Sequence, residues 1–178
     1  MHKDIKEILF TEKDIQERVH ELGAQITRDY NGTTPLLIGV LKGSFIFLAD
    51  LVRRIEQSCE IRFMSASSYG FSSVSAGSVK IGQEIDFHME GRDIILIEDI
   101  LDTGVTLAAL RDFVAAYKPS SLKICAMLDK PSQRKAEITA DYLGFHCPDD
   151  FIVGYGLDYA ERYRNFPYIA SLKPEVYS

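Results

Sequence analysis

The residues that point most directly to chemistry lie in the segment IILIEDILDTGVTL, residues 94–107. An apolar run ends in two adjacent carboxylates, Glu98 and Asp99, and the sequence DTGVT then leads into a helical pattern. This loop offers backbone N–H groups, the hydroxyls of Thr103 and Thr106, a glycine, and the N-terminus of the next helix. These groups together predict a phosphate-binding site.

Two carboxylates beside a phosphate would repel it unless they face something else. Sugar hydroxyls and a magnesium ion are suitable partners, so the pair predicts a phosphorylated sugar bound together with Mg²⁺. In the structural alternative, Glu98 and Asp99 only end a strand, and Asp102 and Thr103 only cap a helix. The functional interpretation is favoured because all these residues occur in one strand–loop–helix context.

Length and composition restrict the class of protein. The chain has 178 residues, of which 46% are hydrophobic and 26% are charged, as is typical of one soluble globular domain. Twenty basic and 26 acidic residues leave a net charge of −6 without a long basic run, so we expect no nucleic-acid partner. Lys42 interrupts the longest apolar stretch, and the first residues lack the apolar core of a secretory signal. We therefore expect no membrane segment, a cytoplasmic location, and reduced thiols at Cys59, Cys125 and Cys147.

Apolar strand patterns alternate with helical patterns along most of the chain. Strands are predicted at 35–41, 59–67, 80–87, 94–99 and 121–128, and helices at 11–30, 44–55 and 106–118. This order predicts an α/β fold with a mainly parallel, twisted sheet flanked by helices. Ligand sites in such sheets lie at the carboxyl ends of the strands.

The C-terminal part departs from this alternation. Short strand candidates at 142–145 and 151–156 precede an aromatic-rich run, which predicts a small hood beside the main sheet rather than another crossover. We therefore expect a single domain over 1–178, with a core at about 32–130 and a hood formed by about 131–178 and the N-terminal segment. The Ser- and Gly-rich stretch 68–78 predicts a mobile loop.

Segment 94–107 resembles the phosphoribosyl-pyrophosphate binding motif of the type I phosphoribosyltransferases. The resemblance extends in order and spacing from residue 36 to residue 165, through VLKGSFIFLADL (40–51), SSYG (67–70), LDK (128–130) and FIVGYGLDYAERYRN (151–165). The last segment resembles the branch that acts on 6-oxopurines. The resemblance implies purine salvage: transfer of a phosphoribosyl group from phosphoribosyl pyrophosphate to hypoxanthine or guanine, giving IMP or GMP and pyrophosphate.

The resemblance also implies which residues bind phosphoribosyl pyrophosphate. They are Lys42, Gly43, Ser68, Tyr69, Glu98, Asp99, Asp102, Thr103, Gly104, Val105, Thr106 and Arg164. Glu98 and Asp99 would bind the ribose hydroxyls and Mg²⁺, and residues 102–106 would surround the 5′-phosphate. Lys42 and Arg164 would meet the pyrophosphate, and in the family the peptide bond before the lysine can be cis.

A second group of residues is implied to bind the purine. Lys130 would donate to the exocyclic O6 and so select 6-oxopurines over adenine. Phe151 would stack on the ring, and Ile152 would offer its backbone carbonyl to an exocyclic amine. Asp158, also assigned to the purine site, would hold a second Mg²⁺ ion on the pyrophosphate side. Asp102 would act as the catalytic base that accepts the proton of N7. In the structural alternatives, Lys130 is a solvated loop lysine, and Phe151 and Ile152 only belong to a core strand.

Two other functions stay open at this point. One is a related transferase that prefers xanthine; the other is a regulatory protein that keeps the pocket as a sensor and binds RNA or DNA. The net charge and the complete base site weigh against the regulator. The sequence contains no GxSxG, HExxH, Walker A or GxGxxG pattern, so those catalytic families are excluded. The resemblance implies a homodimer or homotetramer, and the apolar helix after Lys42 is a candidate interface.

Overall fold

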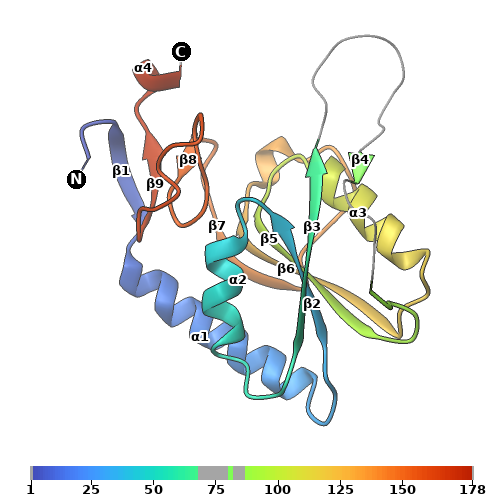
Figure 1. Ribbon diagram of the computed structural model, residues 1–178. Coiled ribbons are helices and arrows are strands. Elements are labelled where there is room, and N and C mark those ends of the chain that lie inside the picture. Colours follow the sequence, from blue (N-terminus) through green and yellow to red (C-terminus); the bar gives the residue numbers. More distant parts are fainter. Residues whose placement is uncertain (1, 68–79, 82–86, 178) are drawn as a thin grey trace, which may run out of the picture.

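The computed structural model describes residues 2–67, 80–81 and 87–177, and in this part the strands form two sheets. Figure 1 shows the larger sheet with its helices and the smaller sheet near both chain ends. The strands are β1 Ile5–Phe10, β2 Leu36–Leu41, β3 Glu60–Ser67, β4 Lys80–Ile81, β5 Asp93–Leu101, β6 Ser121–Asp129, β7 Tyr142–His146, β8 Ile152–Val153 and β9 Ile169–Leu172. The helices are α1 Glu12–Asp29, α2 Phe45–Val52, α3 Val105–Ala115 and α4 Pro174–Tyr177, with a 3-10 turn at Pro131–Gln133.

The larger sheet has the order β4-β3-β2-β5-β6-β7, and every neighbouring pair is parallel except β3 with β4. Its central strands are apolar because both faces are covered. Leu37 packs in the core formed with α1 and α2, whereas Leu36 and Ile38 pack in the core formed with α3. Figure 1 shows these helices on opposite sides of the sheet. The predicted parallel α/β fold is confirmed.

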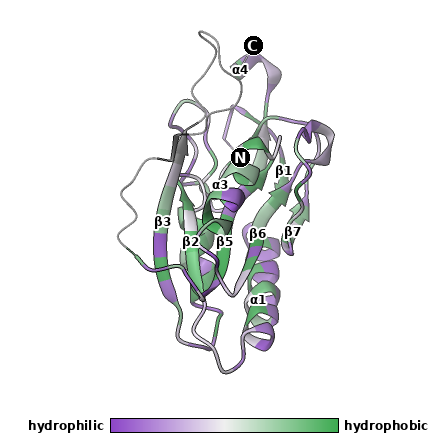
Figure 2. Ribbon diagram, turned by 90° about the vertical axis from the view of Figure 1, so that its right-hand side faces the viewer, coloured by the Kyte–Doolittle hydropathy of each residue, from purple (hydrophilic) through white to green (hydrophobic). Residues whose placement is uncertain are grey.

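Helix α1 forms where the sequence pattern predicts it. Ile15, Val19, Leu22 and Ile26 recur every three or four residues and are all buried against the sheet. Thr11 caps the helix, because its side chain accepts from the backbone N–H of residue 14. Figure 2 shows the resulting stripes of hydrophobic and hydrophilic residues along α1. None of the helices in the described ranges combines the length and the apolar character needed to cross a membrane.

The order of the strands creates a crevice between β2 and β5. The chain leaves β2 through α2 toward β3, and leaves β5 through α3 toward β6, on the other side. The loops that follow these two neighbouring strands therefore diverge. In open α/β sheets, ligands bind at such a switch point, outside the carboxyl ends of the strands. Both segments with predicted chemistry, 42–43 and 98–106, begin at this point.

The prediction for one strand, residues 142–145, assigned it to the wrong sheet. Residues 142–145 were expected in the hood, but they form β7, which extends the main sheet parallel to β6. The Tyr142 side chain is buried, and its hydroxyl donates to Asp29 Oδ2 at 2.6 Å and accepts from Lys123 Nζ at 3.0 Å. These contacts bind β7 to the C-terminal end of α1 and to β6, and the local sequence does not encode them.

Other element boundaries differ more modestly. Helix α2 ends at Val52, and only Ile152–Val153 of the predicted strand 151–156 is a strand. Of the predicted strand 80–87, residues 80–81 form β4 and residues 82–86 lie outside the described residues. The predicted mobile loop 68–78 also lies outside them. Strands β1 and β9 were not predicted.

The small sheet, β1-β9-β8, packs beside the main domain and carries both described chain ends, as Figure 1 shows. Tyr155 links it to the rest of the molecule. The Tyr155 side chain is buried, and its hydroxyl donates to Asp50 Oδ2 at 2.7 Å. The same oxygen accepts from Gln16 Nε2 at 2.9 Å, so one carboxylate of α2 joins the small sheet to α1.

We predict that Tyr155→Phe lowers the free energy of unfolding by about 1–2 kcal/mol, because Asp50 loses a buried donor. In a chain of this size, each kcal/mol lowers Tm by about 2–4 °C, which differential scanning fluorimetry measures. The control is Tyr117→Phe, which removes a hydroxyl from an exposed ring just after the C-terminal end of α3. Equal Tm values for Tyr155→Phe and the wild type would contradict this assignment of Tyr155.

Candidate functional site

A cavity of about 300 Å³ opens at the carboxyl ends of β2 and β5. Residues from three separate segments line it: the loop after β2, the loop after β5, and the segment between β8 and β9. They include Lys42, Gly43, Glu98, Asp99, Asp102, Thr103, Gly104, Thr106, Asp158 and Arg164. The fold therefore brings together most of the residues that the sequence predicted for phosphoribosyl pyrophosphate. Ser68 and Tyr69 lie outside the described residues.

The acidic side of the cavity is formed by the end of β5. Asp99 Oδ1 accepts from the N–H of Ile100 at 2.8 Å, and Glu98 Oε1 accepts from the N–H of Asp99 at 3.3 Å. A side chain at Gly43 would overlap Asp99 Oδ2, so only glycine allows the loop after β2 to lie against this carboxylate. Among the described residues, neither carboxylate forms an ion pair with a basic side chain.

This environment changes the acidity of Glu98. Burial raises its pKa well above the usual value, and the neighbouring negative charge of Asp99 raises it further. A bound cation would reverse this effect because it favours the charged carboxylate. Among the described residues, no three His, Cys, Asp or Glu side chains form a metal cage. Mg²⁺ commonly needs only one or two carboxylates, with water and phosphate oxygens as its remaining ligands.

The loop after β5 presents the N-terminus of α3 to the cavity. Its cap residue, Gly104, has φ = +77°, a conformation that favours glycine, and a side chain there would overlap Ile138 Cγ2. The N–H of Val105 donates to Thr103 Oγ1 at 3.4 Å. Because the side chain of Val105 is apolar, this residue can offer only its backbone N–H to an anion. The N-terminus of a helix, with its backbone N–H groups and nearby hydroxyls, suits an anion such as phosphate.

Arg134 holds this loop, although the sequence pattern assigns it no role. Its guanidinium donates to the carbonyl of Asp102 at 3.1 Å and of Leu101 at 3.2 Å, and to the carbonyl of Ile138. It also pairs with Asp129 at the end of β6. These hydrogen bonds to backbone carbonyls fix the position of the loop. An arginine in a polar turn carries no sequence signal for such a role, so only the three-dimensional contacts reveal it.

Asp102 has an unusual environment. Its Oδ1 atom is buried and has no hydrogen-bond partner among the described residues. A buried acceptor without a partner is costly, and such groups occur where a ligand supplies the missing donor. Charged residues near this loop affect the pKa of the Cys147 thiol. Burial raises its pKa to about 11; the charge of Lys130 lowers this pKa, and the charges of Asp129 and Asp102 raise it. Hydrogen bonds place these segments together: the N–H of Lys130 donates to the carbonyl of Leu101 at 3.0 Å, and the N–H of Cys147 donates to the carbonyl of Asp129 at 2.9 Å.

Of the residues expected to bind the base, Asp158 lines the cavity that contains Lys42 and Asp99, whereas Lys130, Phe151 and Ile152 lie outside it. The Lys130 side chain is only 11% exposed, and its Nζ donates to the carbonyl of Asp150 at 2.8 Å. Phe151 stacks on Tyr177, with ring centroids 5.0 Å apart, and meets Tyr159 edge to face at 5.2 Å. Ile152 is buried in β8, where it pairs with residue 171 of β9.

The basic side of the cavity contains Lys42 and Arg164. The peptide bond between Leu41 and Lys42 is cis, a conformation that the resemblance allows but that the sequence does not determine. Arg164 Nη1 donates to the carbonyl of Gly156 at 2.7 Å, and its Nη2 lies 2.9 Å from Asp158 Oδ1. Arg164 Nε is buried without a partner among the described residues.

The three cysteines, all in the described part, are free thiols.

Comparison with known proteins identifies similar sequences over the whole chain. A family model described as a phosphoribosyl transferase domain matches residues 7–160. The chain is 55% identical over 177 residues to the hypoxanthine-guanine phosphoribosyltransferase of Bacillus subtilis, covering 99% of this chain and 98% of that protein. It is 51% identical over its full length to the bifunctional protein TilS/HprT of Listeria monocytogenes, of which it spans 28%. A crystal structure of a hypoxanthine phosphoribosyltransferase from Staphylococcus aureus superposes with a TM-score of 0.95 at 50% identity, covering 100% of this chain and 97% of that one.

The raised pKa of Glu98 predicts a pH-dependent stability difference. The folded chain holds this proton to higher pH than the unfolded chain, so the free energy of unfolding falls as pH rises from about 4.5 through the folded pKa. Glu98→Gln removes the free-energy cost of ionising this buried carboxyl group. We expect the Tm of Glu98→Gln at pH 8 to exceed that of the wild type by about 2–4 °C, and the difference to vanish toward pH 4.5.

The matched control is Glu137→Gln, which changes an exposed glutamate by the same charge. Thermal unfolding of the three proteins between pH 4.5 and pH 8 checks the expectation. A difference between Glu98→Gln and the wild type that stays constant over this range would contradict a raised pKa at Glu98.

Proposed function

Because the chain belongs to the phosphoribosyl transferase family, we propose that it transfers the 5-phosphoribosyl group of phosphoribosyl pyrophosphate to hypoxanthine or guanine, giving IMP or GMP and pyrophosphate. Its parallel sheet with flanking helices is the type I phosphoribosyltransferase fold. The chain is a glycosyltransferase of purine salvage, similar over its whole length to the hypoxanthine-guanine phosphoribosyltransferases of Bacillus subtilis and Staphylococcus aureus.

The observation that carries the catalytic proposal is the unpartnered, buried Oδ1 of Asp102. This oxygen belongs to the loop that would hold the 5′-phosphate, and the N–H of Lys130 donates to the carbonyl of Leu101, the residue before Asp102. An acceptor in this position can take the proton of N7 as the bond between N9 and C1′ of the ribose forms. We therefore assign Asp102 as the general base.

The phosphate and the sugar would be held by separate groups. The N-terminus of α3, with residues 102–106, would bind the 5′-phosphate through backbone N–H groups and hydroxyls. The carboxylates of Glu98 and Asp99 would face the ribose hydroxyls and hold Mg²⁺. Their donor set fits this ion, since they present carboxylates that lack a basic partner among the described residues. The bound Mg²⁺ supplies positive charge that neutralises the pyrophosphate leaving group.

The leaving pyrophosphate would meet the opposite side of the cavity. Lys42 and Arg164 carry positive charge there, and the buried Arg164 Nε is a free donor within the described part of the chain. Asp158 lies beside Arg164 and would hold a second Mg²⁺ ion. No covalent nucleophile is required, because positioning and electrostatic stabilisation lower the barrier to transfer.

The base site would distinguish purines by their groups at C6. Lys130 Nζ, held by the carbonyl of Asp150, would donate to an O6 acceptor, which adenine lacks. Phe151 would stack on the ring, and the backbone carbonyl of Ile152 would accept from the exocyclic amine of guanine. The aromatic partners of Phe151 would keep its ring in one orientation.

We further propose a cytoplasmic homodimer or homotetramer formed by one catalytic domain with its hood. The exposed apolar side chains of Phe45, Ile61 and Phe63 support an interface on α2 and β3. Light scattering coupled to gel filtration measures the oligomeric state directly. A monomer at micromolar concentration would refute this assembly without affecting the proposed reaction.

We predict that Asp102→Asn lowers kcat by at least about 100-fold, the usual effect of losing a general base, and flattens the acidic limb of the pH–rate profile. The control is Asp112→Asn, since Asp112 is an exposed residue of α3 that pairs with Arg111. Steady-state assays from pH 5 to pH 9 provide both measurements. Nearly full turnover of Asp102→Asn with an unchanged pH profile would refute the base assignment.

The wild-type chain should use hypoxanthine and guanine with kcat/KM at least about 100-fold higher than adenine. A spectrophotometric assay with phosphoribosyl pyrophosphate and Mg²⁺ measures each base separately, with xanthine as the fourth. A preference for xanthine would identify the alternative transferase. Tight binding of phosphoribosyl pyrophosphate without turnover of any base would favour the regulatory alternative.

A further inference from the structure

Glu161 lies between the two cations assigned to pyrophosphate, although no sequence motif assigns it a role. Its Oε1 lies 3.1 Å from Lys42 Nζ, and its Oε2 lies 3.4 Å from Arg164 Nη2. One carboxylate thus contacts a residue that follows β2 and a residue between β8 and β9. We call this pair of contacts the Glu161 bridge.

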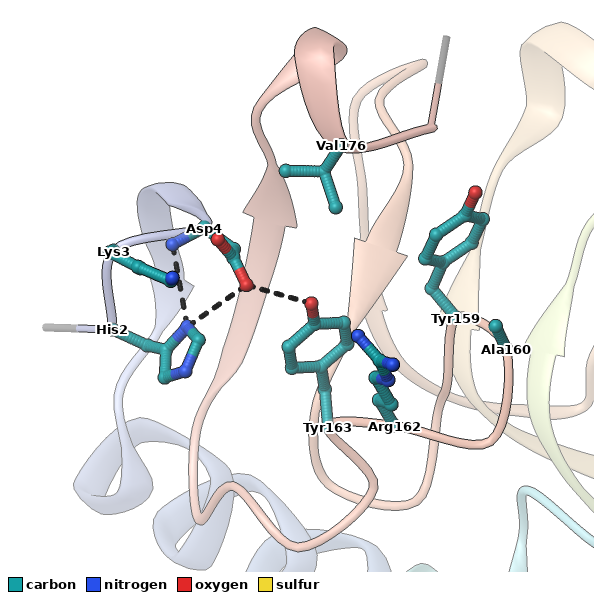
Figure 3. A pocket seen from close by; sticks show the side chains of 8 residues that line it. All are labelled: His2, Lys3, Asp4, Tyr159, Ala160, Arg162, Tyr163 and Val176. Carbon is teal, nitrogen blue, oxygen red and sulfur yellow. Dashed lines mark hydrogen bonds and ion pairs between the residues drawn. The ribbon is translucent and has the colours of Figure 1, made fainter.

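The backbone around Glu161 is firmly anchored. Its N–H donates to Asp158 Oδ2 at 2.8 Å, and Tyr159 forms an antiparallel bridge with Arg162. The hydroxyl of Tyr163 donates to Asp4 Oδ2 at 2.9 Å, as Figure 3 shows in the neighbouring cavity beside β1.

Three residues of this segment also adopt left-handed backbone conformations. Ala160 has φ = 50°, Glu161 has φ = 61°, and Tyr163 has φ = 76°. Such conformations cost energy in residues other than glycine and persist only where the surroundings fix them. The backbone therefore fixes the direction of the Cα–Cβ bond of Glu161, whereas the exposed end of its side chain is free to exchange partners.

We propose that Glu161 is a positioning residue that competes with pyrophosphate for Lys42 and Arg164. Its carboxylate holds both cations toward the cavity until the pyrophosphate group displaces it, and it returns to them as the product leaves. This inference rests on the proposed function, because that function assigns the two cations to pyrophosphate.

The strength of the Glu161 bridge suits such an exchange. The side chains of Lys42 and Glu161 are 69% and 66% exposed, and ion pairs this open to water are weak. A diphosphate carries more negative charge than a carboxylate and offers Arg164 a bidentate acceptor, so it displaces the carboxylate. Without Glu161, the two like charges would lose the anion that lies between them.

The protonation state of Glu161 is consistent with this competition. The hydrogen bond from Lys42 and its charge, with a smaller effect of Arg164, hold the pKa of Glu161 below its usual value. The side chain is therefore a charged competitor at neutral pH. Pyrophosphate must displace an anion to reach its site.

The test is Glu161→Gln, which keeps the side-chain shape and backbone but removes the charge. Calorimetric titration with pyrophosphate in the presence of Mg²⁺ should give a Kd about two- to fivefold lower than that of the wild type, as expected when one exposed ion pair is removed. KM for phosphoribosyl pyrophosphate should fall by a similar factor, and KM for hypoxanthine should not change. Glu161→Asp, which keeps the charge, should restore weaker binding.

Two comparisons separate this effect from a general change in charge. Glu17→Gln removes the same charge from an ion pair of similar exposure on α1, with Lys13, and should leave the Kd for pyrophosphate unchanged. In a Lys42→Ala background, Glu161→Gln should give a smaller gain in affinity, because one of the two contested cations is absent.

The outcomes distinguish the two proposals. Unchanged or weaker pyrophosphate binding by Glu161→Gln in an otherwise active enzyme would overturn the role of Glu161 and leave the proposed function intact. An equal gain in affinity with and without Lys42 would also overturn this role. A wild-type chain that transfers no phosphoribosyl group would overturn both proposals.

Discussion

The parallel pairing of β2 with β5 is the constraint on which the site depends. Residues 36–39 pair in register with residues 94–97, so both strands end at the same edge of the sheet. Since the chain then turns to opposite sides, the two following loops separate and leave a cavity between them. A slip by one residue would turn Leu37 or Ile95 out of the core that contains α1 and α2. Burial of these apolar side chains therefore fixes the register, and the register fixes the positions of the charged loops.

The cavity has two electrostatic sides that differ in how their charges are paired. Glu98 and Asp99 have no basic partner in the described part of the chain, and the pKa of Glu98 is raised. In contrast, Arg164 contacts the carboxylates of Asp158 and Glu161. The unpaired carboxylates favour a cation, whereas the paired cations accept an anion by exchange. A magnesium–pyrophosphate group carries both signs of charge, so it complements both sides.

The sequence predicted the elements whose signal is local. Helix α1 has a complete apolar stripe and a capping residue, and β2 and β5 are short apolar runs bounded by turn residues. In contrast, no local pattern shows that β7 pairs with β6 or that β9 pairs with β1, so 142–145 was assigned to the wrong sheet and β9 was not predicted. Charged residues that follow buried strands were predicted as a site. Arg134 and Glu161 were missed because a charged residue in a polar turn has the same local pattern whether it contacts the site or only solvent.

Buried contacts hold the smaller sheet in place, whereas exposed ion pairs near it can exchange partners. It is joined to the main domain by buried contacts: Tyr155 donates to Asp50, and a side chain at Gly156 would overlap the carbonyl of Gly43. The close backbone approach at Gly156, whose φ is +104°, requires a residue without a side chain. These buried contacts hold the segment that carries Glu161 beside the loop after β2. They do not depend on the ion pairs of the cavity. The exposed ion pairs can therefore break and re-form around a ligand without loosening the sheet that presents them.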